Sequence, residues 1–223
     1  MTFPTYGLKI NDLPTAFPIF PLSGALLLPG GRLPLNIFEH RYLGMVEGAL
    51  AGDRFLGMVQ PKSVKRETVG DGDPIYDIGC LGRITTFAEA EDGRFFITLQ
   101  GLTRFGVSEE LELENGYRRV RPDYSAFIDD VNPRSVDGFV RQPFVDSLQA
   151  YFAFYDIKGS WDALEDADEA TLITSVAMAV PFAPEEKQAI LECSSLVAQG
   201  EMLRSLMEMA VHEAKQGPAP VRH

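Results

Sequence analysis

Residues 17–42 read FPIFPLSGALLLPGGRLPLNIFEHRY, a stretch in which apolar runs alternate with four prolines and a Gly-Gly pair. Proline has no backbone N–H to donate and is tolerated in sheets mainly at strand starts and edges, so Pro18, Pro21 and Pro34 predict short strands with one unpaired side. The LPGG run at 28–31 fits a type II turn, with its proline second and its first glycine third. The segment therefore predicts the corners of a small, strongly bent sheet.

Short apolar runs separated by Gly, Pro and Asp continue to about residue 125 and predict a twisted or barrel-like sheet. EDGR at 91–94 predicts a hairpin, because Asp-Gly supplies the positive φ angles that a tight turn requires. The alternation across 95–100 predicts a strand with one buried and one partly exposed face. One helix, predicted over 39–53 from its apolar spacing and its Gly-Asp end, interrupts this half and should pack across the sheet.

After about residue 125 the apolar pattern becomes helical. The first of these helices carries Val140, Phe144, Leu148 and Phe152 on one stripe, and Pro143 must kink it or lie in its first turn. Three more helices are predicted by DEATLITSVAMAV (168–180), APEEKQAILEC (183–193) and SSLVAQGEMLRSLMEMAVHEAKQ (194–216).

These patterns predict an α+β protein in which a mainly antiparallel bent sheet, or pseudo-barrel, with one helix is followed by an α-helical bundle. The boundaries that we predict are a β-rich subdomain at 14–125, a helical subdomain at 126–215, and terminal extensions at 1–13 and 216–223.

Composition narrows the classes of partner. The chain has 223 residues and a formal net charge of −12, which lacks the basic field that phosphate binding requires, so we expect no nucleic-acid partner. The apolar run GALLLPG is far too short to span a bilayer, so we expect no membrane partner. Cys80 and Cys193 stand alone, which favours a reducing compartment and offers no metal-ligand spacing. We therefore expect a cytoplasmic protein without a metal or other cofactor.

Several motifs in order resemble the amino-terminal, substrate-binding domain of Lon proteases: FPIFPL (17–22), LLPGGRLPLNIFEHRY (27–42) and GRITTFAEAEDGRFFITLQGLTRFGV (82–107). TSVAMAVPFAPEEKQAILE (174–192) resembles the helical part of the same domain. The resemblance implies a Lon N-terminal domain-like fold with a PUA-like sheet. It also implies a module that binds exposed apolar segments of peptides or unfolded proteins.

The resemblance does not extend to catalysis. An intact Lon protease adds an ATPase module and a protease module with a serine-lysine dyad, and we expect this chain to end where those modules would begin. A phosphate-binding loop of the Walker type needs a Gly-Lys pair, and none occurs in the sequence. The sequence also contains neither G-x-S-x-G nor H-E-x-x-H, so we predict no catalytic residues and no enzyme activity.

Two interpretations of the charged run after residue 38 stay open. In the structural one, Glu39 at a helix start accepts backbone N–H bonds, and Arg41 pairs with it or with a strand carbonyl. In the functional one, Glu39, Arg41 and Tyr42 rim a groove near Pro34, where a bent sheet with an open edge accepts a peptide as an added strand.

The last predicted helix offers a second candidate surface. Met202 and Met209 extend its apolar stripe, either to fill gaps in the core or to accept varied apolar partners. We therefore predict peptide binding along the sheet edge from Pro34 to Tyr42, or in a cleft between the sheet and the last helix. The alternatives are a small-ligand or regulatory module, which would present a closed pocket with convergent polar groups, and an accessory subunit of a protease. A homo-oligomer or a protease partner fits either function.

Overall fold

The computed structural model describes residues 9–62, 70, 72–132, 135–158 and 166–216. Its strands are β1 (Phe17–Pro21), β2 (Arg32–Ile37), β3 (Phe55–Val59), β4 (Ile78–Glu89), β5 (Phe95–Glu114) and β6 (Tyr117–Asp123). Its helices are η1 (Ile10–Asp12), α1 (His40–Ala51), η2 (Ser125–Val131), α2 (Arg141–Phe154), α4 (Glu169–Ala179), α5 (Pro184–Glu192) and α6 (Leu196–Gln216).

The strands form one sheet in the order β2-β5-β4-β3-β1-β6, and β5 also pairs with β6. This extra pairing closes β1, β3, β4, β5 and β6 into a ring, while β2 lies outside the ring on the first half of β5. The β1–β3 pair is parallel and the other pairs are antiparallel. The predicted α+β fold with a mainly antiparallel, barrel-like sheet is therefore confirmed.

The proline-rich segment forms the predicted turn and, at Pro34, the predicted edge strand, but β1 has two strand neighbours: Pro18 pairs with β6 and Pro21 pairs with β3. Gly30 has φ +80°, and the Gly31 N–H donates to the Leu28 carbonyl oxygen at 2.9 Å, as a type II turn requires. Pro34 lies in β2, which has one strand neighbour, β5, within the described residues. The edge position of β2 explains how proline is accommodated in a strand.

The hairpin and the alternation in β5 are also as predicted. Residues 90–94 join β4 to β5, and Gly93 has φ +80° in the turn. Phe95, Ile97 and Leu99 are buried, whereas Phe96 is 45% exposed.

The sheet carries an apolar core on each face. The larger core joins β1–β6 to α1, to the loop at 22–31 and to the helices after residue 140. The smaller core lies on the opposite face and includes Phe17, Leu81, Phe105 and Val120. Because strand side chains alternate, each strand of the ring contributes to both cores.

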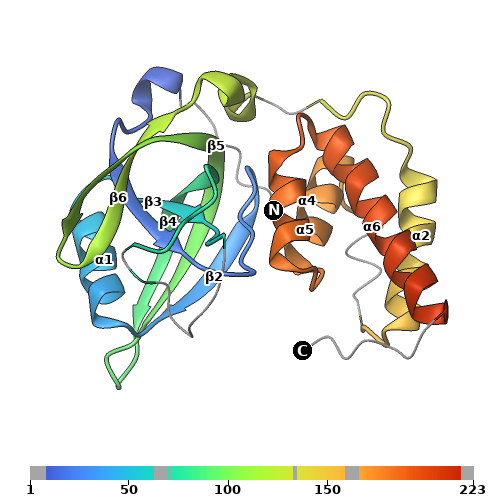
Figure 1. Cartoon of the computed structure of the whole chain (residues 1–223), viewed down its shortest axis with the longest axis horizontal. Helices are drawn as coiled ribbons and strands as arrows, with labels where there is room; N and C mark the ends of the chain where they lie inside the picture. The colour runs from blue at the N-terminus through green and yellow to red at the C-terminus, as the bar shows by residue number, and fades with distance from the viewer. Residues whose placement is uncertain (1–8, 63–69, 71, 133–134, 159–165, 217–223) are drawn as a thin grey trace.

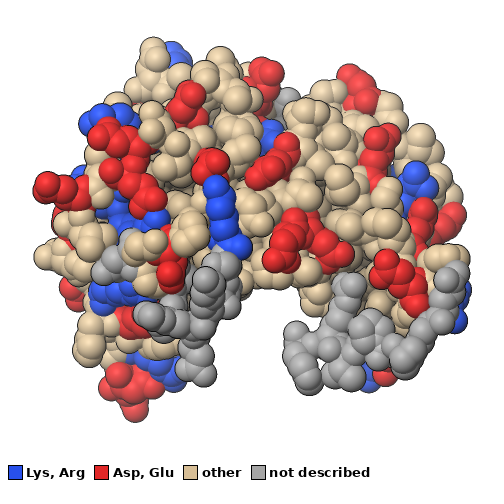
Figure 2. All heavy atoms as spheres, in the orientation of Figure 1, with Lys and Arg blue, Asp and Glu red and all other residues tan. Residues whose placement is uncertain are grey.

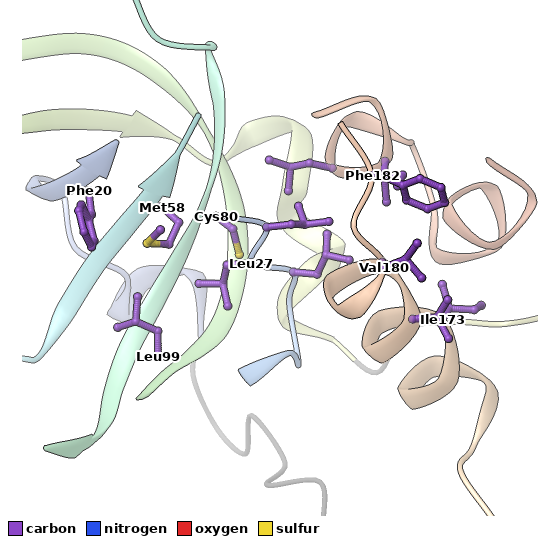
Figure 3. Close-up of a cluster of buried hydrophobic side chains, with 14 of the residues drawn as sticks. Phe20, Leu27, Met58, Cys80, Leu99, Ile173, Val180 and Phe182 are labelled. Atoms are coloured by element: carbon purple, nitrogen blue, oxygen red, sulfur yellow. The ribbon is translucent and has the colours of Figure 1, made fainter. Parts of the chain in front are cut away.

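The loop at 22–31 fills the space between the sheet and the helices. Leu26, Leu27 and Leu28 are at most 2% exposed. In Figure 3, Leu27 lies between Cys80 of the sheet and Val180, which follows α4. The apolar run GALLL is thus part of the core that unites the two halves.

This loop is held against the sheet at Gly101 of β5. The Gly30 N–H donates to the Gly101 carbonyl oxygen at 2.9 Å, and the Gly101 N–H donates to the Gly31 carbonyl oxygen at 2.8 Å. A Cβ atom at position 101 would lie 2.0 Å from the Leu28 carbonyl oxygen. Glycine is therefore required here by the close approach of two backbone segments.

A buried ion pair joins the ring to η2 and to the end of α5. The Arg104 Nε and Nη2 groups donate to the two carboxylate oxygens of Asp130 at 2.8 and 2.9 Å, with both side chains at most 8% exposed. The Arg104 Nη1 group donates to the carbonyl oxygens of Leu191 and Cys193. One guanidinium thus links three elements that are distant in the sequence.

Helix α2 differs from its prediction at Val140, the first residue of the predicted apolar stripe. Pro143 lies in the first turn of α2, which confirms one of the two predicted arrangements. Phe144 and Leu148 are buried as predicted, but the prediction is wrong for Val140, which is 66% exposed because α2 begins after it. Tyr151 is buried in its place.

Figure 1 shows how the two halves are arranged. Helices α4 and α5 lie next to the sheet, α6 packs against them, and α2 lies on the far side of α6. The helical bundle therefore meets the sheet mainly through α4, α5 and the loop at 22–31.

The close approach at Gly101 predicts a stability effect. Gly101→Ala should lower the free energy of unfolding by about 1–3 kcal/mol, because the added methyl group forces the loop and β5 apart. Gly44→Ala is the matched control: its Cβ would meet nothing within 4 Å in the middle of α1, so it should be neutral or stabilise by about 0.5–1 kcal/mol. Urea denaturation of both variants measures the difference, and equal stabilities would refute the assignment.

The buried ion pair predicts a non-additive result. Arg104→Met should lower the free energy of unfolding by about 3–5 kcal/mol, because it leaves the Asp130 carboxylate buried without its cation. The double variant Arg104→Met, Asp130→Leu should be more stable than Arg104→Met alone, since it removes the uncompensated charge. As a control, Arg121→Met breaks an exposed pair with Glu109 and should cost less than about 1 kcal/mol. Additive losses in the double variant would contradict the prediction.

Candidate functional site

The first half of β5 exposes one face together with its two neighbours. The register places Thr98 between Pro34 of β2 and Thr86 of β4, and Phe96 between Asn36 and Ala88. A bulge between Ile84 and Thr86 brings the β4 residues into this alignment. We call this surface the open face and define it by Pro34, Asn36, Thr86, Ala88, Phe96 and Thr98.

The open face is hollowed. Its residues, together with Leu35, Phe87 and Ile97, line a hollow of about 360 Å³. The lining is mostly apolar, with hydroxyl and amide groups from Thr86, Thr98 and Asn36. This size is at the lower end of small-ligand pockets and is sufficient for one or two apolar side chains.

Two exposed phenylalanines, Phe87 and Phe96, line the hollow. Phe96 is 45% exposed and Phe87 is 44% exposed, and Phe38, directly after β2, is 64% exposed. The Phe87 ring rests edge-on against the buried Phe95 ring, with centroids 5.0 Å apart. Single exposed apolar residues are common on protein surfaces, but two exposed phenylalanines that line one hollow indicate a surface that accepts an apolar partner.

Of the residues predicted near the sheet edge, Pro34 lines the hollow. Tyr42 is 4% exposed, and its ring centroid lies 4.4 Å from that of Phe20. Tyr42 therefore belongs to the core and does not rim a groove. The helical period explains this, because Tyr42 shares the buried side of α1 with Met45 and Val46.

Glu39 and Arg41 pair with each other. The Arg41 Nη2 group lies 3.0 Å from the Glu39 carboxylate, and the Arg41 guanidinium lies 4.5 Å from the centroid of the Tyr42 ring. Glu39 is the residue before α1, but its carboxylate accepts no N–H bond from the helix. The structural interpretation is thus correct for the pair and wrong for the cap.

The two methionines differ in exposure. Met202 is partly buried against the larger core, whereas Met209 is 51% exposed on α6. Helices α4 and α5 stand between this part of α6 and the sheet (Figure 1). The fold therefore does not unite the methionines with Pro34 in one site.

A cleft between the sheet and the last helix does exist, at the start of α6. It has a volume of about 340 Å³ and is lined by Arg104, Phe127 and Asp129 on one side and by Ser195 and Gln199 on the other. Neither Met202 nor Met209 lines it. Of the hollows described, this cleft is the most similar to the polar small-ligand pocket of the alternative function. Its Arg104 guanidinium, however, already donates to Asp130 and to two backbone carbonyls, so these N–H groups are engaged within the protein.

Sequence reasoning missed the aromatic and threonine residues of the open face. A signal was present, because Phe96 occupies the more polar side of an alternating strand. The partners Ala88 and Thr86 could not be found, since the bulge in β4 sets their register.

The described ranges contain neither a metal-binding cluster nor a membrane-spanning helix. Within the described ranges, no group of three or more His, Cys, Asp or Glu side chains could hold a metal ion. None of the helices in these ranges combines the length and apolar character that crossing a bilayer requires.

Residues 16–209 match the family described as the ATP-dependent protease La (LON) substrate-binding domain. The chain belongs to this family. The match includes the sheet, the open face and most of α6, so the LON domain accounts for both halves of the fold.

Curated relatives of this LON domain are longer proteins. It is 27% identical over 201 residues to Lon protease 2 of Myxococcus xanthus, covering 88% of this chain and 24% of the relative. It is 33% identical over 106 residues to the Lon protease of Dictyoglomus thermophilum, covering 48% of this chain and 13% of the relative. The chain thus spans about a quarter or less of these relatives.

Solved structures support the fold of the LON domain. A Lon N-terminal domain protein from Xanthomonas campestris has a TM-score of 0.58 at 23% identity, and the N-terminal domain of a Mycobacterium avium complex Lon protease has a TM-score of 0.61 at 13% identity. Each comparison covers 86% of this chain and 98% of the other. The expectation of a Lon N-terminal domain-like fold is therefore confirmed.

Tyr42 is buried and Phe96 is half-exposed, so substitutions at these two positions should change the free energy of unfolding by different amounts. Tyr42→Ala should lower the free energy of unfolding by about 3–5 kcal/mol, because it empties an aromatic position in the core. Phe96→Ser should change it by less than about 0.5 kcal/mol, because nearly half of that side chain is in solvent. Thermal and urea unfolding of both variants provide the measurement. Equal losses would show that Phe96 is a core residue and that the open face is not free.

Proposed function

We propose that the LON domain binds exposed apolar segments of peptides or unfolded proteins on the open face, and that it does so without catalysing a reaction. The observation that carries the proposal is the hollow of about 360 Å³ that is lined by the exposed Phe87 and Phe96 on an uncovered part of the sheet. The family description, a substrate-binding domain, supports the same class of ligand.

Side-chain burial supplies the binding energy in this proposal. Burying two or three apolar side chains contributes roughly 1.5–3 kcal/mol each, and the cost of association offsets a large part of this gain. The expected affinity is therefore in the micromolar range, which suits transient contact with many sequences.

In this proposal, the open edge of β2 contributes less to peptide binding than the open face does. Pro34 has no N–H, so a peptide that paired along β2 would lose a hydrogen bond in the middle of the strand. Proline on an edge strand is a common obstacle to strand addition. We therefore assign the main contacts to side chains of the open face.

The absence of catalysis is supported by what the family match includes. The match is to the substrate-binding domain, and the chain covers a quarter or less of the Lon proteases to which it is similar. Because these relatives are proteases, a protease is the partner class that we propose for delivery of a bound polypeptide.

A titration of labelled, unfolded casein tests the site. Phe96→Ser should weaken binding about tenfold, since loss of one apolar contact of about 1.4 kcal/mol changes affinity by that factor. Met209→Ser is the matched control, because it removes a similarly exposed apolar side chain from α6. It should change binding less than twofold, and fluorescence anisotropy gives both values.

Two outcomes would contradict the proposal. An unchanged affinity in Phe96→Ser would remove the open face from the site, and a loss confined to Met209→Ser would move the site to α6. Gel analysis of the same samples with added ATP should show intact casein. Cleavage that follows the purified protein and is lost on mutation would refute the absence of catalysis.

A further inference from the structure

The two ends of the open face differ in charge. At one end, the register places Gln100 of β5 between Arg32 of β2 and Arg83 of β4, and both arginines are exposed. Arg83 makes no ion pair with any described residue, and its guanidinium lies 5.8 Å from the centroid of the Phe55 ring. This end of the face is therefore basic.

The other end is the hairpin between β4 and β5. The turn exposes the carboxylates of Glu91 and Asp92, and Glu89 is exposed at the end of β4, where its partner Phe95 places it on the opposite face of the sheet. Arg94 offsets one of these charges, because its Nε group lies 2.8 Å from the Asp92 carboxylate. An acidic excess therefore remains at the hairpin end.

The two ends act on a ligand separately. Arg83 and Glu89 are six positions apart on β4, which corresponds to about 20 Å along a strand. This distance is greater than the Debye length of about 8 Å at physiological ionic strength. A charge on a bound peptide thus interacts with the end that it meets and is screened from the other.

The basic end is an exception on an acidic molecule. The formal net charge is −12, and in Figure 2 the helical half at the right shows mostly acidic side chains, whereas the barrel half at the left shows Lys and Arg interspersed with Asp and Glu. Long-range attraction by the whole molecule favours basic peptides. Local complementarity at the arginine end favours an acidic residue there.

We propose that the open face selects apolar polypeptide segments that carry an acidic residue on one side and a basic residue on the other. The acidic residue lies at the Arg32 and Arg83 end, the apolar residues fill the hollow beside Phe96, and the basic residue lies at the hairpin. This inference rests on the proposed function, because it names the class of segment that the same surface takes.

Labelled peptides with one shared apolar core test the inference. Three flank sets are compared: acid and base, base and base, and glutamine on both sides. The acid-and-base peptide should bind about threefold to tenfold more tightly than the base-and-base peptide, as expected for exposed charge pairs that change from attraction to repulsion. The net charge of the protein predicts the opposite order, so the ranking distinguishes the two effects.

Two neutralised variants locate the effect. Arg83→Gln should abolish the preference for the acid-and-base peptide, whereas Arg204→Gln should leave it unchanged. Both variants lose one positive charge from an exposed or half-exposed position, and Arg204 lies on α6. A preference that survives Arg83→Gln, or that both variants lose equally, would overturn the inference.

The glutamine-flanked peptide distinguishes a failure of charge selection from a failure of apolar binding. If the glutamine-flanked peptide binds and Phe96→Ser weakens it, but the charged peptides rank by net charge, the apolar site stands and the charge selection is wrong. If no peptide binds, the proposed function itself is wrong. Circular dichroism of each variant checks that the fold is retained.

Discussion

A single buried ion pair holds the two halves of this LON domain in place. Arg104 pairs with Cys80 of β4, two positions before Gly106, where β5 begins to pair with β6. Its guanidinium reaches Asp130 of η2 and the carbonyl groups at the end of α5. A buried guanidinium is stable only when its N–H groups have acceptors, and the acceptors of this barrel arginine come from residues 130, 191 and 193, in the helical half of the chain. The pair therefore fixes the position of the helices relative to the barrel, beside the apolar contacts of the loop at 22–31.

This arrangement leaves the first half of β5 uncovered on one side. The larger core, the loop at 22–31 and α4 and α5 occupy one face of the sheet, and the smaller core fills the other face within the ring. Strand β2 lies outside the ring, so the face that it shares with β5 and β4 extends past the smaller core. The open face is thus a consequence of adding one edge strand to a closed ring, and the exposed Phe96 belongs to neither core.

Features that depend on a few adjacent residues follow from the sequence, whereas features that depend on packing do not. The turn at 28–31, the hairpin at 91–94 and Pro143 in the first turn of α2 were predictable, because each depends on the φ angles of a few adjacent residues. Glu39 shows the limit of such reasoning. Its place before a helix was predicted, but its carboxylate pairs with Arg41 instead of capping the helix.

The amino-acid pattern alone was sufficient for the α+β class, the order of sheet and helices, and the family resemblance, since periodicity and turn residues are encoded over short distances. It was not sufficient for the open face. Phe96, Ala88 and Pro34 become neighbours through strand register and a bulge at Ile84, and Arg104 meets Asp130 across 26 positions of sequence. Such contacts form only when distant segments pack together, because the free energy that selects a register is that of the whole buried core.

Tyr42 follows the same rule. Its place next to Arg41 in the sequence predicts a residue at the rim of a groove, but the packing of α1 on Phe20 places Tyr42 in the core.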